Sequence, residues 1–315
     1  MPLTRRSFYA EQWLGDAPLS ISALAPSTIT WDGPPAYGQL VRRPGTSTVM
    51  VIFRSGPQSG QYAALSRDWG RTWEQPIRLW GGPDYGTHKI TPDGATLWMA
   101  TASNPVDPSN EVRVFQVDLA SGTIRNGFGT RTSVQNLWAL TGPISVGECT
   151  RVVAPLVVPH ALRLFDVSSD GDVVIARWDA GDPTVSYRLL RRKPSTRTYA
   201  EETLVDGGVE FGYSPARYTG GVTFDTDADH LLLCREDAGT WTYERWTRAA
   251  GGWATEVLVT RDVTSGRTLG RPIVPRGAEG LGLTLVLDIA HYSATRYTDY
   301  LADAMLVRDL GAYSA

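Results

Sequence analysis

Arginine, histidine and tyrosine side chains stand at the predicted starts of several short strands, and these residue types suit an anionic ligand. Arginine binds a carboxylate through two parallel hydrogen bonds. A histidine or tyrosine can remove a proton next to a carboxylate that an arginine has neutralised. The catalytic candidates are His88 and Tyr218, and the ligand-binding candidates are Arg217, Arg271, Tyr37 and Tyr292.

Each of these residues also has a simpler structural interpretation. Arg217 and Arg271 would cap strand ends or pair with neighbouring carboxylates. His88 would be a structural histidine with satisfied hydrogen bonds, and the tyrosines would pack in the core or at its rim. The residues alone leave both interpretations open, so the elements that position them matter.

Motifs for cofactor or metal chemistry are absent from the sequence. It contains no Gly-x-x-x-x-Gly-Lys loop, no His-Glu-x-x-His, no Cys-x-x-Cys pair and no Gly-x-Ser-x-Gly elbow. We therefore expect neither a cofactor nor a bound metal. Cys149 and Cys234 lack metal-ligand spacing and stand in apolar surroundings, which predicts two free buried thiols, with a disulfide as the alternative.

Composition is typical of a globular protein with a large core: 315 residues, 42 % hydrophobic and 20 % charged. A net charge of −3 offers no electrostatic attraction for nucleic acid. No stretch approaches the ~20 apolar residues of a membrane span, so we expect no membrane insertion. Residues 1–8 lack the apolar run of a signal peptide, which predicts synthesis in a cytoplasm without standard export.

Short segments of alternating aromatic or branched residues and polar residues recur along the chain, as antiparallel strands require. No convincing helix or linker interrupts them. We predict one all-β domain over residues 31–315, preceded at residues 1–30 by a tail, an attachment segment or a closing strand. Hairpins or their turns are predicted at residues 91–94, 111–123, 169–171, 184–205, 225–227, 240–259 and 297–307.

One octapeptide, Ser66 to Trp73, fits the pattern Ser-x-Asp-x-Gly-x-Thr-Trp. Asp68 can accept N–H bonds from its own turn, Gly70 can supply a positive φ, and Trp73 is expected to start the next strand and pack inward. The octapeptide resembles the Asp-box of the sialidase superfamily, also called the bacterial neuraminidase repeat, with Ser66, Asp68, Gly70, Thr72 and Trp73 at its fixed positions.

The resemblance implies a β-propeller of five or six antiparallel blades, in which the Asp-box caps a peripheral hairpin. Five repeats are visible, and a shortened sixth blade is considered between Arg131 and His160. Later segments follow an order similar to the branch that resembles ulvan-type polysaccharide lyases. These segments are 218–222, 234–237, 243–246, 271–274 and 297–300.

A propeller forms its pocket at one end of the central channel, where the innermost strands begin. The resemblance therefore implies that the candidates sit close together in space, and we expect Arg217, Arg271 and His88 to converge. The inner strands are expected to begin near Tyr37, His88, Arg151, Arg217–Tyr218 and Arg271.

The chain departs from the residue patterns of both sialidases and ulvan-type lyases, the two kinds of enzyme to which the resemblance points. The sialidase arginine motif, Phe/Tyr-Arg-Ile-Pro, is replaced by Tyr37-Gly38-Gln39-Leu40, and no Tyr–Glu pair is evident. Ulvan-type lyases typically carry a second histidine downstream, and Met99–Asn104 contains none. We therefore expect binding without fast turnover, and classical sialidase activity is disfavoured.

These observations predict a carbohydrate-recognition propeller for acidic cell-surface polysaccharide. A phage or phage-like particle would display it as a tail or spike component, with residues 1–30 contacting other virion proteins. The alternatives are a polysaccharide lyase or glycosidase acting on uronate-containing glycans, and a scaffold propeller that binds proteins through a flat apolar face. A homo-oligomer is also considered.

Overall fold

A computed structural model describes residues 36–55, 60–80, 85–102, 111–153, 160–179, 184–208, 220–265, 267–274, 283–292 and 300–308. Regular structure in these ranges is β-strand, apart from the 3-10 turns η1 (Leu137–Ala139), η2 (Val146–Glu148) and η4 (Val263–Ser265). None of the described helices has the length and apolar character needed to cross a bilayer.

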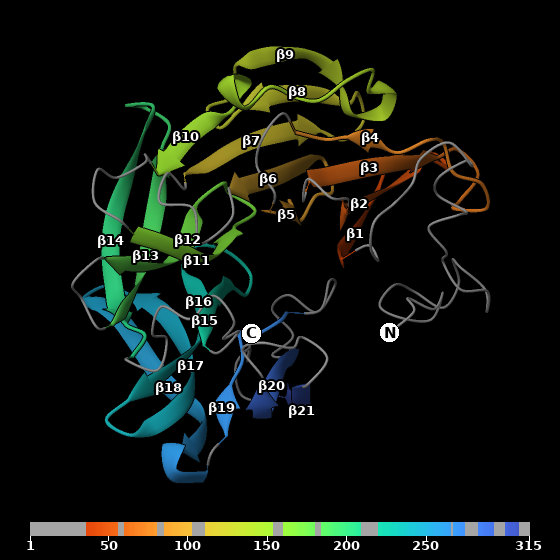
Figure 1. The fold of residues 1–315 in the computed structure, drawn as a ribbon. Helices are drawn as coiled ribbons and strands as arrows, with labels where there is room; N and C mark the ends of the chain where they lie inside the picture. The colour runs from red at the N-terminus through yellow and green to blue at the C-terminus, as the bar shows by residue number, and fades with distance from the viewer. Residues whose placement is uncertain are drawn as a thin grey trace. The chain divides into compact units, whose positions relative to one another are not determined.

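The strands form five sheets, and four of the sheets begin with a complete up-and-down meander (Figure 1). Neighbouring strands whose register is defined pair antiparallel, as the alternating sequence predicts. The first sheet contains β1 (Ala36–Arg42), β2 (Val49–Ser55), β3 (Gly60–Ser66) and β4 (Ile77–Arg78).

Two further meanders and a shorter sheet follow later in the chain. The third sheet contains β11 (His160–Val167), β12 (Val173–Asp179), β13 (Val185–Lys193) and β14 (Thr198–Asp206). The fourth contains β15 (Gly221–Phe224), β16 (His230–Asp237), β17 (Thr240–Ala249) and β18 (Gly252–Asp262). The fifth contains β19 (Thr268–Leu269), β20 (Leu283–Tyr292) and β21 (Tyr300–Arg308).

The second sheet contains strands from the region in which the sequence suggested a shortened sixth blade. On β7, the strand β8 pairs with Phe115–Val117 and leaves the first half of β7 to another strand. The strand β10 also pairs with β7. The strand β9 extends the same sheet beyond β8. The sheet contains β5 (Tyr85–Ile90), β6 (Thr96–Ala102), β7 (Val112–Asp118), β8 (Thr123–Asn126), β9 (Arg131–Asn136) and β10 (Thr150–Val153).

The predicted fold class is confirmed: the chain is an all-β protein with a propeller arrangement of antiparallel blades. Among the described residues, four blades have a complete four-stranded meander and a fifth sheet has three strands, which is fewer complete blades than the five or six expected. Residues 1–30, for which a tail, an attachment segment or a closing strand was expected, lie outside the described residues.

Internal contacts divide the chain into two compact units. The first unit comprises Met1–Gly86, Ile90–Asn104 and Val112–Arg151. The second comprises Thr87–Lys89, Pro105–Glu111 and Val152–Ala315.

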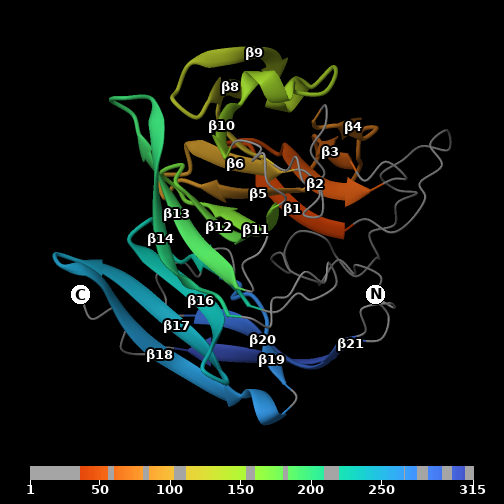
Figure 2. The same cartoon turned by 60° about the vertical axis from the view of Figure 1, so that its left-hand side comes forward.

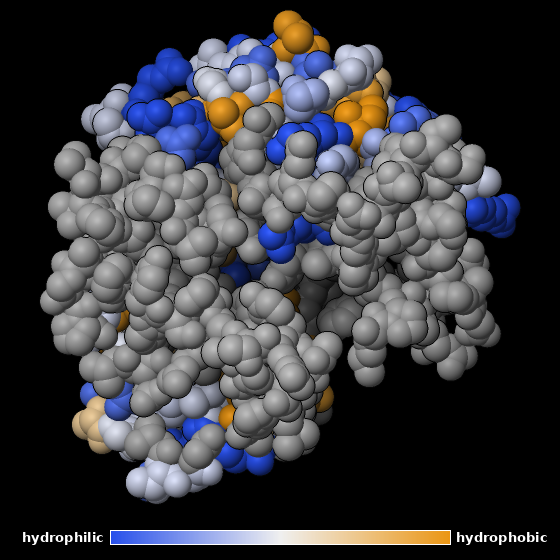
Figure 3. Space-filling view, viewed as in Figure 1, coloured by the Kyte–Doolittle hydropathy of each residue, from blue (hydrophilic) through white to orange (hydrophobic). Residues whose placement is uncertain are grey.

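The core of the first unit is built on buried aromatic residues. Trp80 and Phe115 are fully buried and meet edge to face, with ring centroids 4.7 Å apart. The indole Nε1 of Trp80 donates a hydrogen bond to the side-chain oxygen of Gln61 at 2.6 Å. On the face shown in Figure 3, hydrophobic and hydrophilic residues are interspersed over β8 and β9, and Val134 on β9 is 87 % exposed.

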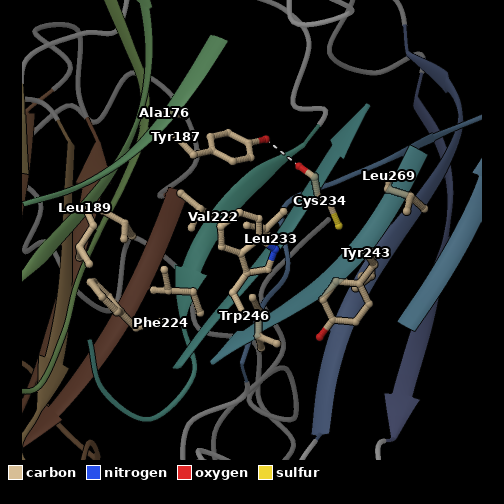
Figure 4. Close-up of a cluster of buried hydrophobic side chains, with 14 of the residues drawn as sticks. Ala176, Tyr187, Leu189, Val222, Phe224, Leu233, Cys234, Tyr243, Trp246 and Leu269 are labelled. Carbon is tan, nitrogen blue, oxygen red and sulfur yellow. Dashed lines mark hydrogen bonds between the residues drawn. The ribbon is translucent and has the colours of Figure 1, made fainter. Parts of the chain in front are cut away.

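The core of the second unit is centred on Tyr187 and the strands of the fourth sheet (Figure 4). The Tyr187 hydroxyl donates a hydrogen bond to the carbonyl of Cys234 at 2.6 Å and accepts one from the backbone N of Gly221 at 2.7 Å. Complete burial raises the pKa of Tyr187 well above its usual value. Cys234 and Cys149 are free and buried, as predicted.

Burial decreases from the middle strands of the fourth sheet to its outer strand. On β17, Trp241 and Tyr243 alternate with Thr242, Glu244 and Trp246, and all five are buried, so both faces of the strand are covered. The outer strand β18, which lies beside β17 in Figure 2, has mostly exposed residues.

Candidate functional site

The turn formed by Ser66–Trp73 has the geometry that its sequence predicts. The Asp68 carboxylate accepts hydrogen bonds from the backbone N of Thr72 at 2.8 Å, from the Thr72 hydroxyl at 2.7 Å and from the Ser66 hydroxyl at 2.8 Å. Gly70 has a φ of 80°. The bonds from Thr72 lower the pKa of Asp68 from 3.8 to about 2.

Trp73 departs from the expectation in two ways. The next strand, β4, begins at Ile77, four residues later than the expected start at Trp73. The Trp73 side chain is half-buried rather than buried, and it packs against Val51, Phe53 and Ala64. The turn projects from the end of β3, so a small cluster covers only part of the indole.

The inner strands of the second unit meet at the Asp166 carboxylate, near the end of β11. Asp166 is only 7 % exposed. Its Oδ1 accepts hydrogen bonds from the Thr87 hydroxyl at 3.0 Å and from the backbone N of Val167 at 2.9 Å. Its Oδ2 accepts from the Thr223 hydroxyl at 2.5 Å and from the backbone N of Phe224 at 3.3 Å. Donors from β5, β11 and β15 thus saturate the acceptor capacity of the carboxylate.

Arg271 lies beside this carboxylate, after the end of β19. Its position is fixed on both sides, because Leu269 pairs with Asp288 and Ile273 bridges to Leu285 on β20. The Arg271 guanidinium places Nη2 3.5 Å from Asp166 Oδ2, and its side chain is 28 % exposed. Among the described residues, no partner receives a hydrogen bond from this guanidinium.

Side chains from both faces of the strand β5 belong to the same unit. Thr87 contacts Asp166, and the Lys89 ammonium donates a hydrogen bond to the carbonyl of Asp225 at 3.2 Å. Successive side chains of a strand point to opposite faces, so His88 projects to the other face of β5, where it is buried and 7 % exposed. Thr87 therefore links the strand that carries His88 to Asp166, while the imidazole points away from Thr87.

The remaining sequence candidates lie largely outside the described residues. Arg217 and Tyr218 belong to an undescribed segment, and only the backbones of Tyr37 (on β1) and Tyr292 (on β20) are described. Arg151 was expected to begin an inner strand, and this expectation was wrong. It lies on β10, which pairs with the third strand of the second sheet, because β9 and β10 extend that sheet.

Sequence reasoning missed Asp166 and its partner Thr223. A weak signal exists in the sequence, where Asp166 is a lone carboxylate between Phe165 and Val167, just before the predicted turn at 169–171. A carboxylate at such a position is rarely buried unless it is paired. No group of three or more metal-ligating side chains occurs within the described ranges.

No protein-family model and no curated protein matches the chain. A PL25 ulvan lyase bound to -[GlcA(1-4)Rha3S]- has a similar structure, with a TM-score of 0.59 and 13 % sequence identity over 87 % of this chain and 64 % of that one. A second structure of a PL25 ulvan lyase gives the same values. The polysaccharide lyase Uly1 aligns with a TM-score of 0.49 and 13 % identity over 88 % of this chain and 58 % of its own.

The chain thus spans 64 % of the length of the PL25 ulvan lyase. At 13 % identity the likeness shows the propeller fold and nothing of the site.

Proposed function

We propose that this chain recognises an acidic carbohydrate, and that Arg271 binds the acidic group. The observation that carries the proposal is a part-exposed guanidinium fixed in position beside a carboxylate that is already saturated by other donors. Arginine binds carboxylates and sulfate esters through its planar fork of N–H donors. The N–H donors of Arg271 would therefore bind the acidic group of a ligand.

A further cation supports an anionic ligand at the same inner strands. The Lys89 ammonium lies at Asp225, the residue that follows Phe224 in the chain, and Phe224 donates its N–H to Asp166. Arg217, which is one residue before Tyr218, would add a second guanidinium.

The likeness to a solved lyase that is bound to -[GlcA(1-4)Rha3S]- supports a uronate-containing or sulfated polysaccharide as the ligand class. On a phage-like particle, many weak sites would combine into high avidity. In that setting, residues 1–30 would contact other particle proteins.

An array of acidic and neutral polysaccharides tests the proposal, with the purified chain and an Arg271→Gln variant side by side. We expect the wild-type chain to bind acidic members in a salt-sensitive manner, and the variant to lose at least tenfold in affinity. A matched control is Arg188→Gln, which removes an arginine that pairs with Glu201 on the β13–β14 hairpin. Equal binding by the wild type and Arg271→Gln would contradict the proposal.

A polysaccharide lyase is the alternative function, favoured by the same structural likeness and by His88 on β5. Incubating the array members with the protein and following ultraviolet absorbance of unsaturated products separates the two. Products that disappear in His88→Ala or Tyr218→Phe would make the chain a lyase. Binding without product is the result that we expect.

A further inference from the structure

Charge, rather than hydrogen bonding, holds Arg271 beside Asp166. The Nη2–Oδ2 distance of 3.5 Å exceeds the ~2.7–2.9 Å of a charge-assisted hydrogen bond. Asp166 Oδ2 already accepts the Thr223 hydroxyl at 2.5 Å and the Phe224 N–H at 3.3 Å. The carboxylate therefore attracts Arg271 electrostatically without accepting a hydrogen bond from its guanidinium.

We propose that Asp166 is a specificity-determining counter-ion, which fixes Arg271 and also restricts the anions that Arg271 accepts. An anion on the exposed side of Arg271 lies several ångströms from the Asp166 charge and is repelled by it. This repulsion grows in proportion to the charge of the ligand. Asp166 therefore penalises a doubly charged phosphate group more than a singly charged uronate carboxylate or sulfate ester, and so it reduces the advantage that the higher charge would otherwise have at Arg271.

The inference rests on the proposed function, because it concerns the ligand of the same arginine. It predicts a direction of change in anion affinity that a purely structural aspartate would not produce. Removing the charge of a structural aspartate would leave binding unchanged or weaken it, whereas removing the charge of a counter-ion strengthens anion binding.

The test uses simple anions as probes, so that it does not depend on finding the natural glycan. The side-chain Nε–H signal of Arg271 is followed by NMR and assigned by its disappearance in Arg271→Gln. Acetate and inorganic phosphate, which is largely a dianion at pH 7.5, are titrated at constant ionic strength. Asp166→Asn should bind acetate roughly threefold to tenfold more tightly than wild type, and its gain for phosphate should be larger.

Asp262→Asn is the matched control for net charge. Asp262 lies at the end of the outer strand β18, where its carboxylate accepts hydrogen bonds from Thr264. This variant changes the net charge by the same amount and should leave anion binding at Arg271 within about twofold of wild type.

Thr223→Val keeps the test decisive if Asp166→Asn does not fold. Valine has nearly the shape of threonine but cannot donate to Asp166, so Oδ2 gains a free acceptor site. Arg271 should then turn toward the carboxylate and bind acetate more weakly, by about threefold. The two variants therefore shift the affinity in opposite directions.

Unchanged or weaker acetate binding in Asp166→Asn would overturn the inference, as would any strengthening in Thr223→Val. An Arg271 signal that no anion perturbs in any variant would overturn both the inference and the proposed function. If the anion affinities shift as expected but no acidic polysaccharide binds, the counter-ion role stands and the proposed glycan function fails.

Discussion

Asp68 and Asp166 both accept hydrogen bonds from threonine hydroxyls and backbone N–H groups, but they connect very different lengths of chain. Asp68 binds Thr72, four residues away, and is half-buried on its turn. Asp166 binds Thr87 and Thr223, which are 79 and 57 residues away, and is 7 % exposed. The first stabilises one turn, and the second joins inner strands of different blades.

The comparison explains why a conspicuous motif and the proposed binding site need not coincide. All donors to Asp68 lie within the eight residues of the motif, so the turn can form wherever two strands must be connected. Asp166 obtains its donors only when the sheets have assembled. It therefore holds the Arg271 guanidinium in a defined place, where we propose that an anionic ligand binds.

The largest expected effect is the loss of stability when Asp166 is truncated. Asp166→Ala leaves the buried donors of Thr223, Phe224 and Val167 without an acceptor, and we expect a loss of about 3 kcal/mol or more in the free energy of unfolding. Chemical denaturation measures this loss, with Asp68→Ala as the comparison. The contrast between the two aspartates fails if Asp166→Ala costs no more than Asp68→Ala.

A second connection between blades should affect stability without affecting binding. Tyr187→Phe removes the hydroxyl that joins Cys234 to Gly221, and we expect a loss of about 1–3 kcal/mol because two buried backbone groups lose their partner. Tyr199→Phe, which removes a half-buried hydroxyl bonded to the carbonyl of Gly171, should cost less. Reduced binding of an acidic glycan by folded Tyr187→Phe would show that blade connection alone controls the site.

The smallest effect concerns the pH dependence that Asp68 contributes. Its folded pKa of about 2 lies below the ordinary 3.8, so its stabilising contribution is present above pH ~4 and is lost as the pH falls toward 2. Asp68→Asn should therefore have a Tm a few degrees below wild type at pH 6, and this difference should shrink between pH 4 and pH 2. A Tm difference that stays constant over this range would contradict the assignment.

Local features were predictable from the sequence, whereas long-range pairings were not. The bonds of Asp68, the positive φ of Gly70 and the turns of the hairpins follow from neighbouring residues. The pairing of β10 with β7 depended on the shortness of β8, which the residue pattern did not reveal. Asp166 and Thr223 became recognisable only through their contact, because nothing in either local sequence specifies a partner 57 residues away.

One measurement tests the central claim that the inner strands around Arg271, and not the Asp68 turn, bind the ligand. Calorimetric titration of an acidic oligosaccharide into wild type, Arg271→Gln and Asp68→Asn compares the two regions under identical conditions. We predict that Arg271→Gln loses at least tenfold in affinity and that Asp68→Asn binds like wild type. Equal affinities for wild type and Arg271→Gln, or a selective loss in Asp68→Asn, would contradict the claim.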